Sequence, residues 1–171
     1  MKISQLMSGR TPDPDYAEGV TNDNMVLAVD CGSTPATAIS ASAVAGFAVV
    51  QKGITGVDSS MNPITEDKTY LRVGTSTTKT GTQRGFEITG DRFEGDEFQK
   101  FALSHAIKYG TGSAVQRRYV YFNILTGKGE SGLVSIIVNS DGSGEAGEAA
   151  QIEIELKCVG EAPEEYTYAA S

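Results

Sequence analysis

The sequence predicts a mainly β protein, an antiparallel β-sandwich or barrel with one flanking α-helix and extended N- and C-terminal arms. Apolar and polar residues alternate in several segments, only one segment has helical periodicity, and no βαβ alternation is present. The composition agrees, because 20 glycines, no Trp and a hydrophobic fraction of 39% are unlike a dense helical protein. A length of 171 residues fits one domain with two tails.

Residues 1–23 are expected to form an extended arm. They contain two closely spaced prolines among acidic residues and asparagines, with no apolar periodicity. The segment 161–171 is expected to be a second tail, solvated by default, although Tyr166 and Tyr168 at alternate positions would suit docking on a neighbour. Such segments become ordered only when a surface is available for them to dock on.

The domain between the tails, residues 24–160, carries the strand pattern. Its clearest strand places Ile152 and Ile154 on one face and Glu153 and Glu155 on the other, so that one face meets a core and the other meets water. The expected strands cover residues 25–31, 49–57, 119–125, 133–138 and 151–159.

One helix is expected over about residues 96–109. Asp96 is placed to cap its N-terminus, and Gly110 is placed to end it. Phe98 and Ala102 belong to a set of apolar residues at helical spacing, which predicts a broad apolar face laid against the sheet.

A polar, Thr-rich stretch over about residues 74–85 contains no apolar residue. It is either a long loop or an extended hairpin that protrudes from the domain. Long structureless loops are uncommon in compact domains and are usually functional, so the stretch is a candidate for partner contacts.

The charge excludes one broad class of function. The chain has a formal net charge of −8 and a pI near 4.6, so it has no electrostatic reason to bind nucleic acid. Cys31 and Cys158 are expected to be free thiols, since no N-terminal leader directs the chain to an oxidising compartment. No apolar stretch is long enough for a membrane anchor, and we expect a soluble protein made in the cytoplasm.

No catalytic, cofactor-binding or metal-binding pattern is found. The single histidine, His105, has no second His or nearby Cys to form a zinc site or a catalytic pair. The stretch 142–147 fits G-x-G-x-x-G, but a strand follows it where a dinucleotide site needs a helix. We therefore expect no enzymatic activity and no cofactor.

The segment 53–101 contains a strand, a polar excursion, a Thr/Gly-rich stretch and an acidic entry into a helix, in this order. The residues concerned lie in 53–63, 66–71, 79–86 and 88–96, the last reading ITGDRFEGD. In this order the segment resembles the major tail tube protein of long-tailed, non-contractile bacteriophages, and the similarity extends over most of residues 24–160.

The resemblance implies a structural virion protein whose hexameric rings stack into a tail tube, the conduit for DNA delivery into the host. It implies assembly with a tape-measure protein and with tail-tip and tail-terminator proteins, in a virion tail formed in a host bacterium. Under this interpretation Glu153 and Glu155 are candidates for an acidic face turned to the lumen, past which DNA slides without binding. The candidate contacts between subunits are Thr77, Thr78, Lys79, Arg84, Tyr166 and Tyr168.

Two alternatives remain open at this stage. The first is a tube protein of a contractile tail or of a secretion-system-like machine. The second is a monomeric β-sandwich binding module, which would need a ligand pocket with exposed aromatic residues and would form no polymer.

Overall fold

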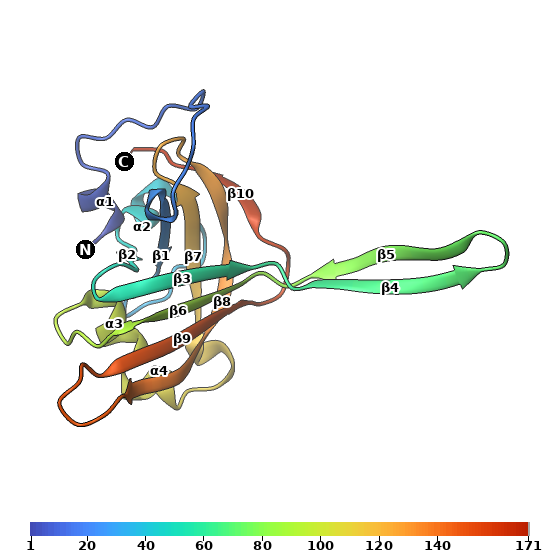
Figure 1. The fold of residues 1–171 in the computed structure, drawn as a ribbon. Coiled ribbons are helices and arrows are strands. Elements are labelled where there is room, and N and C mark those ends of the chain that lie inside the picture. The colour runs from blue at the N-terminus through green and yellow to red at the C-terminus, as the bar shows by residue number, and fades with distance from the viewer. Residues whose placement is uncertain (171) are drawn as a thin grey trace.

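The computed structural model describes residues 1–170 and consists of a strongly curled antiparallel sheet from which a long hairpin projects (Figure 1). The sheet has the strand order β2-β1-β7-β8-β9-β6-β3, with β10 paired to β8, and the hairpin is a separate β4–β5 ladder. The strands are β1 (Met25–Val29), β2 (Ala48–Val49), β3 (Ile54–Ser60), β4 (Pro63–Tyr70), β5 (Gly74–Thr82), β6 (Gly85–Asp91), β7 (Gln116–Asn123), β8 (Lys128–Ser143), β9 (Gln151–Cys158) and β10 (Glu164–Thr167). The predicted mainly β, antiparallel fold class is confirmed.

Two apolar cores lie on opposite faces of β1 and β7. One core contains Phe86, Ile154 and Leu156 under the β6–β9–β8 part of the sheet. The second contains Phe47 and Phe122. Successive residues of β1 enter alternate cores, which explains why this strand is apolar on both faces rather than alternating.

The prediction of a single helix is wrong in one respect, because the segment forms two short helices, α3 (Glu97–Ala102) and α4 (His105–Lys108). Asp96 caps α3 as expected, its side chain accepting a hydrogen bond from the Gln99 amide at 3.1 Å. At Ser104 the backbone is extended, with ψ of 152°. The break allows Leu103, which would leave the apolar stripe of a continuous helix, to be buried in the same core as Ile107.

The N-terminal arm is not the wholly extended segment that the sequence predicts. Residues Ile3–Leu6 form α1, and Ile3 is fully buried in the second core next to Met7. The Ile3 amide donates to the Phe47 carbonyl at 3.1 Å, just before β2. The remaining helical segments are α2 (Ala41–Ala45), η1 (Asn22–Asn24) and η2 (Gly112–Val115).

The C-terminal segment also departs from the expected solvated tail. Strand β10 pairs in antiparallel fashion with the first residues of β8, and Tyr166 and Tyr168 lie against Phe122 with ring centroids 5.7 and 5.9 Å away. These aromatic contacts, which lie within one chain, give the segment enough buried apolar surface to become ordered.

Of the two conformations expected for the polar stretch over residues 74–85, a long loop or an extended hairpin, the structure shows the hairpin. Strand β5 pairs with β4 along its whole length, with one register shift near Ile64. The turn is formed by Leu71, Arg72 and Val73, and Arg72 has a φ of 66°, in the left-handed region. The sequence did not predict β4, because neither of its faces is buried and it therefore lacks a clear apolar alternation.

Candidate assembly surfaces

The β4–β5 hairpin is the first candidate surface. Every residue of β4 is exposed, and every residue of β5 except the half-buried Gly81 is exposed. Thr77, Thr78 and Lys79, the predicted contact residues, lie along the exposed β5 strand. A two-stranded hairpin without further packing is only marginally stable in water, so an additional surface is needed to fix it.

Arg84 holds the root of the hairpin. Its Nε donates to Glu130 Oε1 at 2.7 Å, and its guanidinium carbon lies 4.8 and 5.1 Å from the ring centroids of Phe86 and Tyr121. Its side chain is 9% exposed. Arg84 is therefore largely buried within this chain, and its predicted contact between subunits stays a prediction.

Glu130 is the residue that sequence reasoning missed at this root. The Tyr119 hydroxyl also donates to Glu130 Oε1, at 3.1 Å. Burial raises the pKa of the Tyr119 phenol, as do its hydrogen bonds with Cys158 and Glu130, so the phenol remains a neutral donor at physiological pH. Glu130 lies 46 residues from Arg84, and no local pattern in the sequence indicates that the two residues meet.

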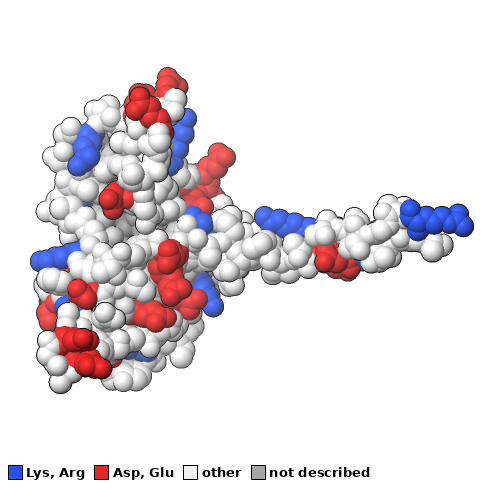
Figure 2. Space-filling model, in the orientation of Figure 1, with Lys and Arg blue, Asp and Glu red and all other residues white. Residues whose placement is uncertain are grey.

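The second candidate surface is the solvent face of β3, β6, β9 and β8. Asp58, Glu87 and Glu155 are directly opposite one another across β3, β6 and β9, and Glu153 lies two residues away along β9, opposite Thr89. Like charges in such positions repel, because opposite side chains in a sheet lie about 5 Å apart. Figure 2 shows acidic side chains spread over these strands, beside the hairpin root.

Few cations offset this acidic face. Lys157 forms an ion pair with Glu155 at 3.2 Å, and Asn139 donates to Glu153 at 3.3 Å. The predicted amphipathic strand is thus present, with Ile152, Ile154 and Leu156 buried on its other side. Because these contacts relieve the repulsion only in part, the row of carboxylates does not favour the stability of the fold, and this points to a role in function.

The third candidate surface consists of two strand edges that pair with no further strand, although η2 and α4 lie beside the β8 edge. Strand β3 pairs only with β6, and the part of β8 beyond Ile136 pairs only with β9 among the strands of residues 1–170. Strand directions alternate through β8, β9, β6 and β3, since each neighbouring pair is antiparallel. A second copy whose distal β8 lies beside β3 would therefore continue the antiparallel sheet without interruption.

Cys31 and Cys158 are both partly buried. Both cysteines are free, as predicted. Burial, followed by the negative charges of Glu97 and Asp30, raises the pKa of Cys31 to about 12, which keeps this thiol protonated and unreactive. Within residues 1–170, no group of three or more His, Cys, Asp and Glu side chains is arranged to hold a metal ion.

No helix in residues 1–170 is a candidate for crossing a membrane. Over the part of the chain that the structure describes, every helix is too short or too polar to cross a bilayer.

Comparison with known proteins gives matches in structure only. No protein-family model matches the sequence, and no curated protein matches it. A chain from the tail of an empty gene transfer agent particle, refined helically with C6 symmetry, superposes with a TM-score of 0.58 at 16% identity. The 171-residue protein has the fold of that tail component. The match covers 88% of this chain and 100% of the other.

A second solved structure agrees. A chain of the virion of a native gene transfer agent particle superposes with a TM-score of 0.53 at 13% identity, again over 88% of this chain and 100% of that one. The fold implied by the resemblance to phage tail tube proteins is confirmed by these two matches, which depend on tertiary structure rather than on sequence identity.

Proposed function

We propose that this chain is the structural subunit of a phage-like tail tube, in which rings of six copies stack to form a conduit for DNA. The observation that carries the proposal is the pair of strand edges on β3 and distal β8 that pair with no further strand, at the two sides of a four-stranded face with alternating strand directions. A head-to-tail contact of this kind forms a ring when the rotation closes. The fold shared with a tail of C6 symmetry supports six copies.

Ring closure would also remove the liability of the exposed strand edges. An uncovered edge is a template for uncontrolled aggregation, and a closed barrel has none. In such a ring the face that carries Asp58, Glu87 and Glu155 would point to the lumen. A lumen of carboxylates offers DNA phosphates no cations to contact, so that DNA passes without being retained. No catalytic step or cofactor belongs to this function.

The proposal includes the partners that a tail requires. A tape-measure protein would occupy the lumen during assembly, and tail-tip and tail-terminator proteins would end the tube in the virion. A tube in a contractile tail or secretion-system-like machine would use the same subunit geometry. The presence of a sheath around the native tube would favour that second candidate over a non-contractile tail.

The test is negative-stain electron microscopy of the purified protein over a concentration series, with sizing chromatography in parallel. We expect hollow rings or tubes of uniform width. If the protein remains monomeric at every concentration, and also after addition of a tail-tip extract as initiator, the tube proposal is wrong and a monomeric binding module takes its place.

The lumen assignment is tested separately by charge reversal. Tubes of Glu87→Lys with Glu155→Lys are expected to retain DNA at low salt and to release it as salt rises, because counterion release drives such binding. A matched control reverses two exposed carboxylates outside this face, Glu18→Lys with Glu161→Lys. Equal DNA retention by both variants would place the acidic face elsewhere than the lumen.

A further inference from the structure

The tip of the hairpin has the most exposed apolar side chains among the described residues. Leu71 is 87% exposed and Val73 is 81% exposed, and Tyr70 beside them is 54% exposed. Arg72 stands between the two aliphatic residues at the turn. An apolar group of this kind at the end of a projecting arm is typical of a contact surface and has no folding role within the chain.

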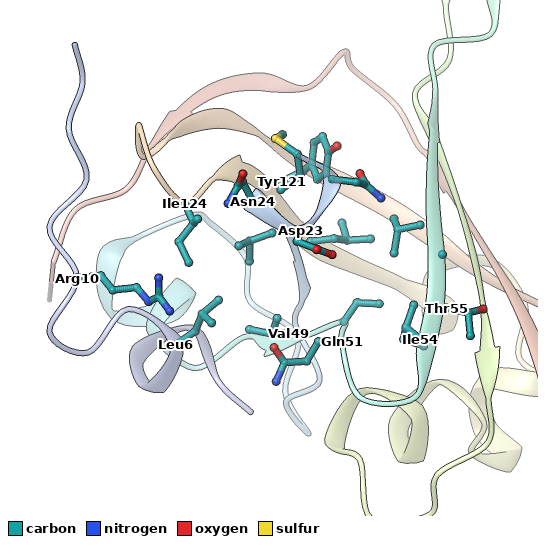
Figure 3. A pocket seen from close by; sticks show the side chains of 17 residues that line it. Leu6, Arg10, Asp23, Asn24, Val49, Gln51, Ile54, Thr55, Tyr121 and Ile124 are labelled. Atoms are coloured by element: carbon teal, nitrogen blue, oxygen red, sulfur yellow. The ribbon is translucent and has the colours of Figure 1, made fainter. Parts of the chain in front are cut away.

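A cavity of about 390 Å³ lies between β1 and β3, and we refer to it as the β1–β3 slot. Its walls include the half-buried side chains Leu6, Ile54, Tyr121 and Ile124. Figure 3 shows Leu6, Ile54 and Ile124 around the hollow, with Asp23 among them. A cavity of roughly 150 Å³ accommodates a benzene-sized group, so the slot is large enough for two aliphatic side chains.

We propose that the hairpin tip of one copy inserts into the β1–β3 slot of a second copy, with Leu71 and Val73 in the slot. This inference rests on the proposed tube function and names the contact that joins one ring to the next. The walls of the slot are mixed, with polar side chains such as Arg10, Asn24 and Gln51 beside the apolar ones. The apolar side chains of the tip would meet the apolar part of the walls, and the insertion would remove both from water.

The hairpin is slightly basic, and the slot contains one charged side chain of each sign, Asp23 and Arg10. The hairpin, residues 63–82, has a net charge of +1, from Lys68, Arg72 and Lys79 against Glu66 and Asp67. Since the whole chain has a net charge of −8, the residues outside the hairpin have a net charge of −9. Asp23 at the slot is the acidic partner available to Arg72. Opposite charges at an interface orient the encounter and fix its register.

The geometry makes the occupant a second copy. The hairpin leaves the domain where β3 ends at Ser60 (Figure 1). The slot is lined instead by the other part of β3, from Ile54 to Val57. Strand β4 has eight residues and projects about 27 Å from its root. The tip therefore points away from the slot of its own chain. A contact between opposite ends of identical subunits is heterologous and repeats as an open stack.

The first test uses single substitutions at the tip. Leu71→Asp and Val73→Asp are expected to reduce the amount of tube about tenfold or more while rings remain, because a charge at the centre of an apolar contact is strongly unfavourable. The matched control is Ser76→Asp, on the exposed stem of the same hairpin. Normal tubes from both tip variants would overturn the inference and leave the ring proposal intact, whereas loss of rings would contradict the ring proposal itself.

A second test measures proximity without requiring tubes. Leu71→Cys protein is mixed with Gln51→Cys protein under mild oxidation, since Gln51 is exposed at the slot. We expect a disulfide-linked dimer that contains one copy of each variant. Ser113→Cys replaces Gln51→Cys as an exposed control away from the slot. Equal yields from the two mixtures would mean that the tip does not select the slot.

Charge reversal with rescue tests the orientation of the contact. Arg72→Glu is expected to weaken stacking several-fold, and Asp23→Arg in the same chain is expected to restore part of it. Failure of the double variant to assemble better than Arg72→Glu would exclude the Arg72–Asp23 pairing.

Discussion

The hairpin and the sheet from which it projects are adjacent in sequence, yet they are stabilised in opposite ways. Strand β6 has Phe86 and Ile88 almost fully buried, while the neighbouring β4 and β5 have no buried residue at all. The sheet is held by its cores, whereas the hairpin is held by its backbone ladder and by polar contacts such as the Thr69–Thr75 hydroxyl pair at 3.2 Å. The difference indicates that the sheet supplies folding and the hairpin is kept for contact with other copies.

The largest effect is expected from loss of an aromatic ring in the sheet. Phe86→Ala should lower the free energy of unfolding by about 3–5 kcal/mol, because Phe86 is 1% exposed and its loss leaves a cavity beside Tyr119. Denaturant unfolding of the monomer measures this change. A loss below about 1 kcal/mol would mean that the core collapses around the site or contributes less than its burial indicates.

The next effect concerns the junction between the two regions. Arg84→Met should cost about 2–3 kcal/mol, because Glu130 would then retain only the Tyr119 hydroxyl as a donor in a partly buried site. We also expect faster amide exchange in β4 and β5, since the hairpin root would no longer be fixed. Arg84→Lys is the control, which keeps the charge but not the planar stacking. Unchanged exchange in the hairpin would show that the root is fixed by other contacts.

A smaller effect is expected when a ring is removed from the hairpin. Tyr70→Ala should change the stability of the monomer by less than about 0.5 kcal/mol, because Tyr70 is 54% exposed and packs on no core. The same unfolding measurement applies, and the contrast with Phe86→Ala is the sharpest form of the comparison. A cost comparable to that of Phe86→Ala would mean that the hairpin folds onto the domain in solution.

The smallest effect is expected at the far end of the sheet. The hydrogen bond and charge of Lys108 lower the pKa of Asp141, whose Oδ2 lies 2.9 Å from Lys108 Nζ. Because its pKa is lowered in the folded state, Asp141 stabilises the fold at pH values above the ordinary pKa of Asp. This stabilisation is lost as the pH falls below about 4. Asp141→Asn should therefore flatten the acid limb of the stability curve slightly, as measured by thermal unfolding between pH 3 and 7. If the acid limb is unchanged, the loss of stability at low pH is due to other carboxylates.

The sequence predicted most of the strands that have an apolar face, but it missed β6, in which Phe86 and Ile88 are buried. The strand with Ile152, Ile154 and Leu156 was found because one side of it is buried. Strand β4 was missed because both its sides are exposed, and α1 was missed because a single turn of helix with Ile3 buried gives too short a pattern to detect.

The candidate surfaces were only partly predictable. Glu153 and Glu155 were identified from alternation along one strand, but Asp58 and Glu87 join them through strand pairing, which the sequence does not reveal. The β1–β3 slot likewise combines residues from near the N-terminus with residues beyond position 120. Long-range pairing and the resulting cavities depend on the whole packing arrangement, which local patterns do not contain.

At Arg72, the left-handed backbone sets the stability of the turn against the contacts that the arginine side chain can make with other molecules. A residue with a side chain is disfavoured there by roughly 1–2 kcal/mol, and glycine would adopt the same φ of 66° at little cost. Arg72→Gly would therefore make a better isolated turn while removing the guanidinium from its most projecting point. A hairpin improved in this way as a fold would be a poorer connector, and the tension between the two is local to one residue.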